Sequence, residues 1–235
     1  MTIGVIGAMQ MEVDTLQESM TDVHREECSG ICFIQGRIEE VDIVAAVCGV
    51  GKVFAAICAE AMILNYHVDA VVNIGVAGSL TRDLGVLDVA VASHVVQHDM
   101  NTTAIGDPLG LLSGINEIFL PADVRMNQLL AECLEEEGIR YLTGPIATGD
   151  LFVEGQKRKD LIRSRFGAIA AEMEGGSIGQ VCYVNHVPFA ILRSISDSEG
   201  GAVDFETFAE QAALQSIAVV VRFIQRLAAG CECGS

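Results

Sequence analysis

Short runs of aliphatic and β-branched residues alternate along this chain with longer segments that have a helical pattern. Strands are expected at Thr2–Gly7 and at residues 31–35, 42–47, 69–74, 86–96, 139–147, 168–171 and 187–196. Helices are expected at residues 9–19, 53–66, 123–138, 155–165, 175–185 and 205–227. Buried strands that alternate with helices predict an α/β fold in which helices cover both faces of the sheet. We therefore expect a three-layer αβα sandwich with a mixed, largely parallel central sheet.

The chain shows no linker, internal repeat or low-complexity segment, so residues 1–235 are expected to form a single domain. Segment 99–121 is the least periodic part and is rich in glycine and proline. A loop of this length inside a compact domain is usually functional, so we expect it to take part in binding.

The charge balance excludes several classes of protein. The chain has 14 Lys and Arg against 32 Asp and Glu, a formal charge of −18, and 51% of its residues are hydrophobic. Such a chain is too apolar for a disordered tail and too acidic to bind nucleic acid or an anionic membrane surface by charge. Its apolar N-terminus lacks basic residues, and no run reaches the roughly 18 apolar residues of a membrane span. We therefore expect a cytoplasmic protein with no membrane partner.

The cysteine pattern indicates free thiols rather than a metal site. Several of the eight cysteines, such as Cys48 and Cys182, lie inside apolar runs, as buried thiols do in a reducing compartment. The close pairs Cys28/Cys32 and Cys231/Cys233 do not have the C-x-x-C spacing of a zinc site. We expect no metal and no cofactor.

In parallel sheets, ligands bind where strands end, so the residues that follow each predicted strand are examined first. Glu12 follows the first strand and falls in the first turn of the expected helix, where it is either a helix-dipole acid or a functional group. The glycine turn at 75–78 follows another strand and either brings the backbone close to a ligand or is an ordinary tight turn.

Two later strand ends carry charges. Glu172 and Glu174 flank Met173 after an apolar strand, and they are either solvated loop acids or a paired functional site. Arg193 interrupts an apolar strand and therefore needs an ion-pair partner or a ligand. Asp197, which ends this segment, is either a helix N-cap or a catalytic acid.

Familiar phosphate and nucleophile motifs do not fit. Residues 49–53 resemble the end of a P-loop, but position 46 is Ala and Val53 replaces the required Ser or Thr. No Gly-x-Gly-x-x-Gly follows the first strand, and no Gly-x-Ser-x-Gly is present.

Six ordered motifs together resemble a known family. They are Gly-Ala-Met-x-x-Glu at 7–12, Gly-Val-Gly-Lys at 49–52, Asn-x-Gly-x-Ala-Gly at 73–78, Thr-Gly-Asp-x-Phe at 148–152, Glu-Met-Glu at 172–174 and Arg-x-x-Ser-Asp at 193–197. This pattern, in register from residue 2 to about residue 225, is similar to the 5′-methylthioadenosine/S-adenosylhomocysteine nucleosidases. They are the hydrolytic branch of the purine nucleoside phosphorylase superfamily. The resemblance implies a homodimer that binds a small purine nucleoside.

The resemblance also implies roles for individual residues. Asp197 would protonate N7 of the adenine leaving group, Glu12 would activate the attacking water with Arg193 nearby, and Glu174 would bind the ribose hydroxyls. Phe152 would stack on adenine, the Val153 backbone would bind its edge, Met173 would pack beside the sugar, and Phe205 would cover the pocket. The other residues expected at the substrate are Met9, Val50, Val76, Ala77, Gly78, Glu172, Ser196 and Ile105. The loop around Thr102, Ile105 and Asp107 would reach the partner's 5′-substituent pocket.

This assignment agrees with the chemistry of N-glycosidic cleavage. Positive charge develops on the ribose and negative charge on the base, so an acid above the base and a carboxylate near the sugar both accelerate the reaction. Phosphorylases of the superfamily place arginines around phosphate, whereas the loop at 7–12 contains a carboxylate and no Arg or Lys. The sequence therefore favours hydrolysis over phosphorolysis.

Two departures from the family keep alternatives open. Val76 stands where relatives often have a small hydroxyl residue, and Ile105 and Asp107 stand where aromatic residues are common. The choice among methylthioadenosine, S-adenosylhomocysteine, 5′-deoxyadenosine and a futalosine-type nucleoside stays open. The alternatives to a nucleosidase are a phosphate-dependent phosphorylase and a non-catalytic nucleoside-binding protein on the same fold.

Overall fold

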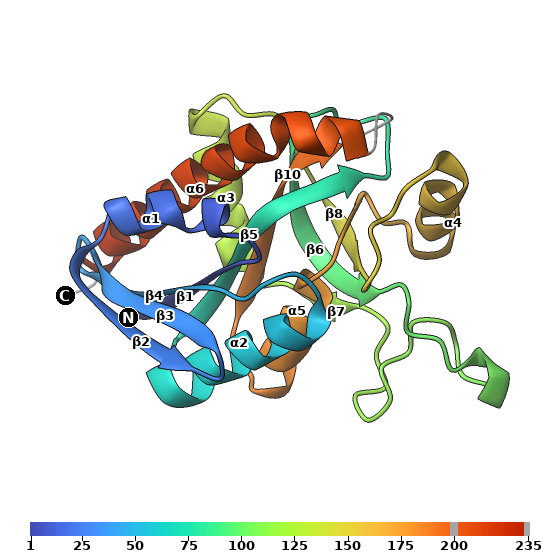
Figure 1. The fold of residues 1–235 in the computed structure, drawn as a ribbon, viewed down its shortest axis with the longest axis horizontal. Helices are drawn as coiled ribbons and strands as arrows, with labels where there is room; N and C mark the ends of the chain where they lie inside the picture. The colour runs from blue at the N-terminus through green and yellow to red at the C-terminus, as the bar shows by residue number, and fades with distance from the viewer. Residues whose placement is uncertain (198–201, 233–235) are drawn as a thin grey trace.

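The computed structural model describes residues 1–197 and 202–232, and within them ten strands form one sheet (Figure 1). The strands are β1 (Thr2–Gly7), β2 (Thr21–Cys28), β3 (Ile31–Ile38), β4 (Val41–Val47), β5 (Ala70–Ser79), β6 (Val89–Gln97), β7 (Leu120–Pro121), β8 (Tyr141–Thr148), β9 (Ala170–Glu172) and β10 (Phe189–Asp197). The helices are α1 (Asp14–Glu18), α2 (Lys52–Tyr66), α3 (Val124–Glu136), α4 (Gln156–Phe166), α5 (Gly175–Val184) and α6 (Ala202–Glu232), and the 3-10 turns are η1 (Gln10–Glu12) and η2 (Thr103–Ile105).

The sheet is partly closed on itself. Its strand order is β10-β6-β8-β9-β5-β1-β4-β3-β2 with β7 beside β6, and β10 also pairs with β5, so the strands from β10 to β5 form a ring. The pairings of β1 with β4 and β5, of β10 with β5, and of β8 with β6 and β9 are parallel. The other described pairings are antiparallel. The mixed α/β fold class is thus confirmed, with parallel pairings forming half of the described ladders rather than most.

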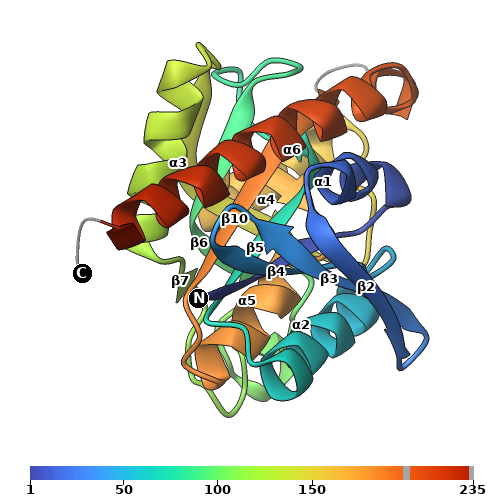
Figure 2. The same ribbon diagram turned by 90° about the vertical axis from the view of Figure 1, so that its left-hand side faces the viewer.

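Helices cover both faces of the sheet, as the apolar strands predict. Helices α1, α3 and α6 lie on one face, and α2 and α5 lie on the other (Figures 1 and 2). Along β10, Phe189 and Ile191 belong to the core cluster beneath α2 and α5, whereas Ala190 and Leu192 belong to the cluster beneath α6. Because successive side chains point to opposite faces, a strand buried on both sides must be apolar throughout. Arg193, which follows these four residues in β10, is charged, and it lies in the candidate active site described below.

The glycine segment expected to be a turn is part of a strand. β5 continues from Ala70 to Ser79, so the prediction that the strand ends at Ile74 is wrong. The extra residues pair with β10 on one side, where Gly75 lies opposite Arg193, and with β9 on the other, where Gly78 lies opposite Ala171. Pairing with β10 and β9 keeps this glycine-containing segment in an extended conformation.

Two expectations near the N-terminus are also wrong. The helix expected at 9–19 is instead η1 followed by the five-residue α1, because the backbone at Val13 (φ −124°) interrupts the helix. Strand β2 was not predicted, because nearly all of its residues are exposed and its sequence has no apolar alternation. It pairs only with β3 among the described strands and so forms an edge of the sheet.

The closing helix α6 is longer than expected and passes a simple test for a membrane span. Its segment Phe208–Ala229 is long and apolar enough to cross a bilayer, so the prediction that the chain has no such segment is wrong by length and composition. Half of that segment is buried inside the protein, and the helix packs across β10 and β5. Burial of this kind is typical of a core helix.

Candidate active site

A cavity opens at the carboxyl ends of β1, β5 and β10, beside the junction of β9 and α5. It encloses about 200 Å³, far more than the roughly 10–15 Å³ that one water needs. Of the residues expected at the substrate, thirteen line it: Met9, Glu12, Val50, Val76, Ala77, Gly78, Phe152, Val153, Glu172, Met173, Glu174, Arg193 and Ser196. The topology explains this convergence, because parallel strands bring their ends to one edge.

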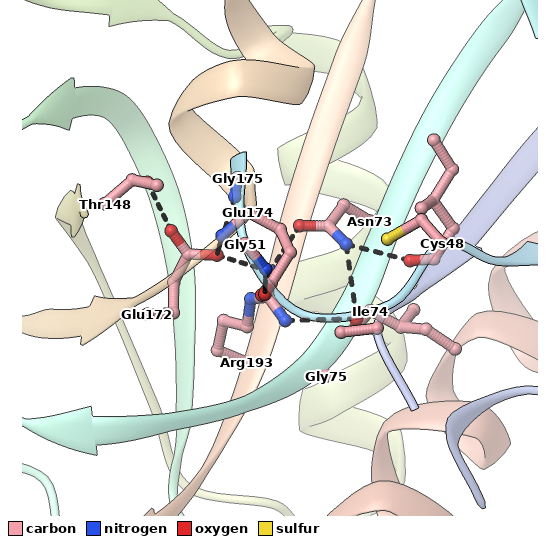
Figure 3. Close-up of polar contacts among 12 residues, drawn as sticks. Cys48, Gly51, Asn73, Ile74, Gly75, Thr148, Glu172, Glu174, Gly175 and Arg193 are labelled. Atoms are coloured by element: carbon pink, nitrogen blue, oxygen red, sulfur yellow. Dashed lines mark hydrogen bonds and ion pairs between the residues drawn. The ribbon is translucent and has the colours of Figure 1, made fainter. Parts of the chain in front are cut away.

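Arg193 is the central charged group of the cavity wall. Its side chain is 1% exposed, and its guanidinium donates to Asn73 Oδ1 at 2.5 Å and to the Ile74 carbonyl at 3.2 Å (Figure 3). It also pairs with Glu172 and, at 3.5 Å, with Glu174. Burial alone would lower the pKa of Arg193, but the nearby carboxylates outweigh burial and raise it, so the guanidinium stays charged. Of the two interpretations offered by the sequence, the ion pair is confirmed. Arg193 also lines the cavity, and its contact with a ligand stays a prediction.

Glu172 holds the start of α5 in place. Its carboxylate accepts hydrogen bonds from the backbone N–H of Glu174 at 3.0 Å and of Gly175 at 2.6 Å, and from the Thr148 hydroxyl. Anionic groups are favoured at such a helix N-terminus. Glu172 and Glu174 are both buried and both reach Arg193, so the alternative that they are solvated loop acids is wrong.

Gly75 leaves the space that Arg193 fills. Its φ is +153°, and a Cβ at this position would overlap Arg193 Nη1 and lie 2.9 Å from Glu12 Oε1. The segment 73–78 therefore needs glycine here, because the arginine and the Glu12 carboxylate both occupy the space that a Cβ would take.

Glu12 is a buried carboxylate in the first turn of η1. It is 1% exposed, and its Oε2 accepts the backbone N–H groups of Ala8 at 2.6 Å and Met9 at 3.0 Å. Burial raises its pKa, and this effect outweighs the opposing influence of Arg193 and of these hydrogen bonds. A carboxylate with a raised pKa is suited to take up a proton near neutral pH.

Glu174 lines the same cavity as Glu12. The backbone N–H of Gly51 donates to its Oε1 at 2.9 Å. Burial raises the pKa of Glu174 to about 7, helped by the charges of Glu172 and Glu12 and opposed by Arg193. The site therefore concentrates several carboxylates around one arginine.

The residues expected to contact the base have different exposures. Phe152 is partly exposed at its mouth, while Val153 and Ser196 are buried in the wall. The backbone of Asp197 pairs with Gly78, a lining residue, but the side chain of Asp197 lies outside the described part of the structure. The Phe205 side chain lies outside it as well.

The loop that follows β6 does not reach this cavity in its own chain. Ile105 in η2 is 82% exposed and lies outside the cavity lining, as do Thr102 and Asp107. In Figure 1 this loop extends away from the body of the protein. These residues are therefore placed apart from the other predicted site residues.

Sequence reasoning missed five lining residues, namely Ala8, Leu80, Leu151, Lys159 and Ala171. Lys159 is 4% exposed although it belongs to α4, whose other charged residues are exposed. The basic pattern of this helix gives no signal that one lysine turns inward. Leu80 and Ala171 are ordinary apolar residues, so only the fold identifies them.

The described residues contain no group of three His, Cys, Asp or Glu side chains placed to hold a metal. Cys48, the cysteine near Glu174 and Glu12, is buried, and burial raises the pKa of its thiol to about 12. This thiol therefore stays protonated and unreactive. The side chains of Cys231 and Cys233 lie outside the described part.

Comparisons with known proteins agree with this geometry. The family model of the phosphorylase superfamily matches residues 2–225. A 5′-methylthioadenosine/S-adenosylhomocysteine nucleosidase of Oceanobacillus iheyensis is 34% identical over 230 residues, covering 97% of this chain and 100% of the relative. The enzyme of the same name from Bacillus subtilis strain 168 is 35% identical over 231 residues, with the same coverage.

Solved structures give the same result. A mutant of the Helicobacter pylori nucleosidase with 5′-methylthioadenosine in its active site has a TM-score of 0.92 and 35% identity, covering 96% of this chain and 98% of that one. A native futalosine hydrolase of Helicobacter pylori strain 26695 also has a TM-score of 0.92, with 36% identity and coverage of 96% and 97%. The chain therefore belongs to the 5′-methylthioadenosine/S-adenosylhomocysteine nucleosidase family, within the phosphorylase superfamily.

Proposed function

We propose that this protein hydrolyses the N-glycosidic bond of 5′-methylthioadenosine, S-adenosylhomocysteine or both, and releases adenine. The observation that carries this proposal is the buried carboxylate of Glu12 in the loop after β1, where a phosphorylase needs cationic groups. A carboxylate repels phosphate and accepts a proton from water. The named activity of the relatives at 34–35% identity supports the same reaction.

In this mechanism, Asp197 donates a proton to N7 of adenine while the bond between N9 and C1′ breaks. The electron pair of that bond stays with the base, which leaves as neutral adenine. Water adds to C1′ of the cationic ribose, and Glu12 takes the proton that the water loses. Asp197 must be protonated to act, so the pocket must raise its pKa well above the usual value of about 3.9.

The remaining groups orient the nucleoside. Glu174 accepts hydrogen bonds from the ribose hydroxyls, and Arg193 keeps this carboxylate in place. Phe152 stacks on adenine, the Val153 backbone binds its edge, and Met173 packs beside the sugar, in keeping with their positions at the cavity.

We further propose that the protein is a homodimer and that it works in the cytoplasm. On α2, Val53 is 70% exposed and Phe54 is 50% exposed, and Val50 beside them is also exposed. Contiguous exposed apolar side chains mark interaction surfaces. Phe205 covers the pocket, and the exposed loop around Ile105 contributes to the 5′-substituent pocket of the partner subunit.

The experiment that tests the reaction measures adenine release in phosphate-free buffer and again with phosphate added. We expect equal rates in the two buffers, and in each the ribose-containing product carries no phosphate from the buffer. Strict phosphate dependence would establish the phosphorylase alternative, and tight nucleoside binding without turnover would establish a binding protein. The same assay with 5′-methylthioadenosine, S-adenosylhomocysteine, 5′-deoxyadenosine and a futalosine-type nucleoside ranks the substrates.

A further inference from the structure

Lys52 closes a ring of hydrogen bonds with two aspartates at the rim of the cavity. Its backbone N–H donates to Asp150 Oδ1 at 2.8 Å, and its ammonium donates to Asp99 Oδ1 at 2.8 Å. The backbone N–H of Asp150 completes the ring by donating to Asp99 Oδ2 at 3.0 Å. The ammonium also donates to Gln97 Oε1 at 3.2 Å. Hydrogen bonds to charged groups are stronger than neutral ones, so this ring is well suited to hold its members in register.

The ring joins three segments that are distant in the sequence. Lys52 is the first residue of α2, Asp99 follows β6, and Asp150 lies in the loop after β8. Burial acts to raise the pKa of Asp99, but the hydrogen bonds from Lys52 and Asp150 outweigh it and lower that pKa, so Asp99 stays ionised. The side chains of Lys52 and Asp99 are only 20% and 30% exposed, so solvent weakens their ion pair less than it does at an open surface.

Two of these segments carry groups of the substrate site. The residue before Lys52 is Gly51, whose N–H donates to Glu174, and Asp150 is followed by Leu151 and Phe152 at the cavity. Gly51 has φ +102°, and a Cβ there would lie 3.1 Å from Asp150 Oδ1. The close approach of the two loops therefore requires glycine at this position.

These contacts also explain the Gly-Val-Gly-Lys motif, which the sequence alone leaves without a function. The N-terminus of α2 is occupied by the Asp150 carboxylate, and the Lys52 ammonium is bound to Asp99 and Gln97. A phosphate would have to displace a carboxylate from the helix end and compete for this ammonium. The motif serves contacts within the protein instead.

We propose that Lys52 is a positioning residue for the hydrolysis, because it locks the loop that binds Glu174 to the loop that carries Phe152. The inference rests on the proposed function, since it assigns Lys52 a role in aligning the sugar-binding carboxylate with the base-binding ring. Lys52 itself lies outside the cavity lining and touches no reacting atom in this assignment.

The test compares Lys52→Met, Asp99→Asn and the double variant with wild type in the adenine-release assay. We expect each single variant to raise KM for 5′-methylthioadenosine about tenfold or more, with a smaller fall in kcat, because both loops contact the bound nucleoside. The double variant is expected to be no worse than the worse single variant, because either change opens the same ring. Lys52→Arg, which keeps the charge, is expected to restore most of the loss. Additive losses, or an unchanged KM, would overturn the proposal.

A pH profile separates positioning from a general loss of stability. Burial raises the pKa of Glu174, Arg193 on β10 and the Gly51 N–H lower it, and Glu172 on β9 and Glu12 on η1 raise it further. Loss of the Gly51 contact in Lys52→Met is therefore expected to move the acidic limb of kcat/KM to higher pH. A merely destabilised protein would keep the limb where wild type has it, and that result would contradict the proposal.

Hydrogen exchange at the Gly51 amide tests the ring independently of catalysis. We expect at least tenfold lower protection of this amide in Lys52→Met and unchanged protection in Arg37→Met, which breaks an exposed ion pair of β3. Equal protection in wild type and Lys52→Met would overturn the proposal. If wild type releases no adenine, the proposed function fails, while the exchange measurement still decides whether Lys52 orders the loop.

Discussion

Arg193 and Glu172 form an ion pair in which each side chain is only 1% exposed. Arg193 comes from the middle of β10, directly after four apolar residues, and Glu172 comes from the end of β9. Burying one charge without the other is very costly, so the pair is stable only as a unit. Because Glu172 also accepts hydrogen bonds from the backbone at the start of α5, the ion pair fixes the position of Glu174, the N-cap residue of that helix.

Glu172→Gln removes the charge of this partner but keeps its shape. We expect the free energy of unfolding to fall by about 3 kcal/mol, because Arg193 loses its nearest carboxylate and keeps only the charges of Glu174, at 3.5 Å, and Glu12 near it. Urea denaturation measures the change. Glu40→Gln, which breaks an exposed ion pair with Arg37, serves as the control and is expected to change stability by less than about 0.5 kcal/mol. Equal effects of the two substitutions would contradict this account.

Gly75→Ala places a methyl group where Arg193 and Glu12 meet. We expect kcat/KM to fall by about 100-fold or more, because the arginine must move away from the carboxylates that it orients. Steady-state kinetics and a thermal unfolding curve are measured together. Gly85→Ala is the matched control, since a Cβ there meets Asp88 only at an ordinary contact distance of 3.7 Å. Near-normal kinetics of Gly75→Ala would show that the close approach is unimportant.

The acidic limb of the pH profile reports the buried carboxylates. Burial raises the pKa of Glu12, and it raises that of Glu174 from 4.5 to about 7. Both groups act as ionised carboxylates, so kcat/KM is expected to fall as the pH drops through about 7, well above the ordinary range for glutamate. Initial rates from about pH 4 to 9 test this sign. A limb near pH 4.5 would mean that neither raised pKa governs activity.

Asp197→Asn tests the proposed acid. We expect turnover to fall by about 10²–10⁴-fold, because the amide donates no proton to the leaving base, while nucleoside binding by calorimetry is retained. Asp22→Asn on the exposed strand β2 is the control and is expected to leave both measurements unchanged. Turnover of Asp197→Asn close to that of wild type would refute the assignment.

Val53→Asp tests the proposed dimer. Placing a charge in the exposed apolar surface of α2 is expected to produce monomers in sedimentation experiments and to lower activity. Val124→Asp on α3 is the matched control, because Val124 is 68% exposed against 70% for Val53 but lies on the opposite face of the sheet. An active wild-type monomer, or the same behaviour of both variants, would rule out this interface.

The sequence predicts the α/β fold and much of the cavity for one physical reason. Charged residues within or just after buried strands, such as Arg193 and Glu12, cannot remain unpaired, and parallel strands bring their carboxyl ends together. The order of strands in the sheet and the pairing of β10 with β5 are not visible in the sequence, because they depend on long-range contacts.

The errors have equally specific causes. The segment after Ile74 looks like a turn because of its glycines, yet both glycines are strand residues, and Gly75 leaves room for Arg193. Strand β2 has no apolar periodicity to reveal it. Lys159 belongs to a basic helix that appears fully solvated in the sequence, and only packing turns this lysine into the cavity.

The place of β10 has a consequence for how the protein is made. Among the described strands it is the last to leave the ribosome, although it inserts between β5 and β6, which are synthesised much earlier. Until β10 is synthesised, the carboxylates of Glu12, Glu172 and Glu174 lack the Arg193 guanidinium that offsets their charge. Catalytic competence therefore requires that β10 has been synthesised and inserted.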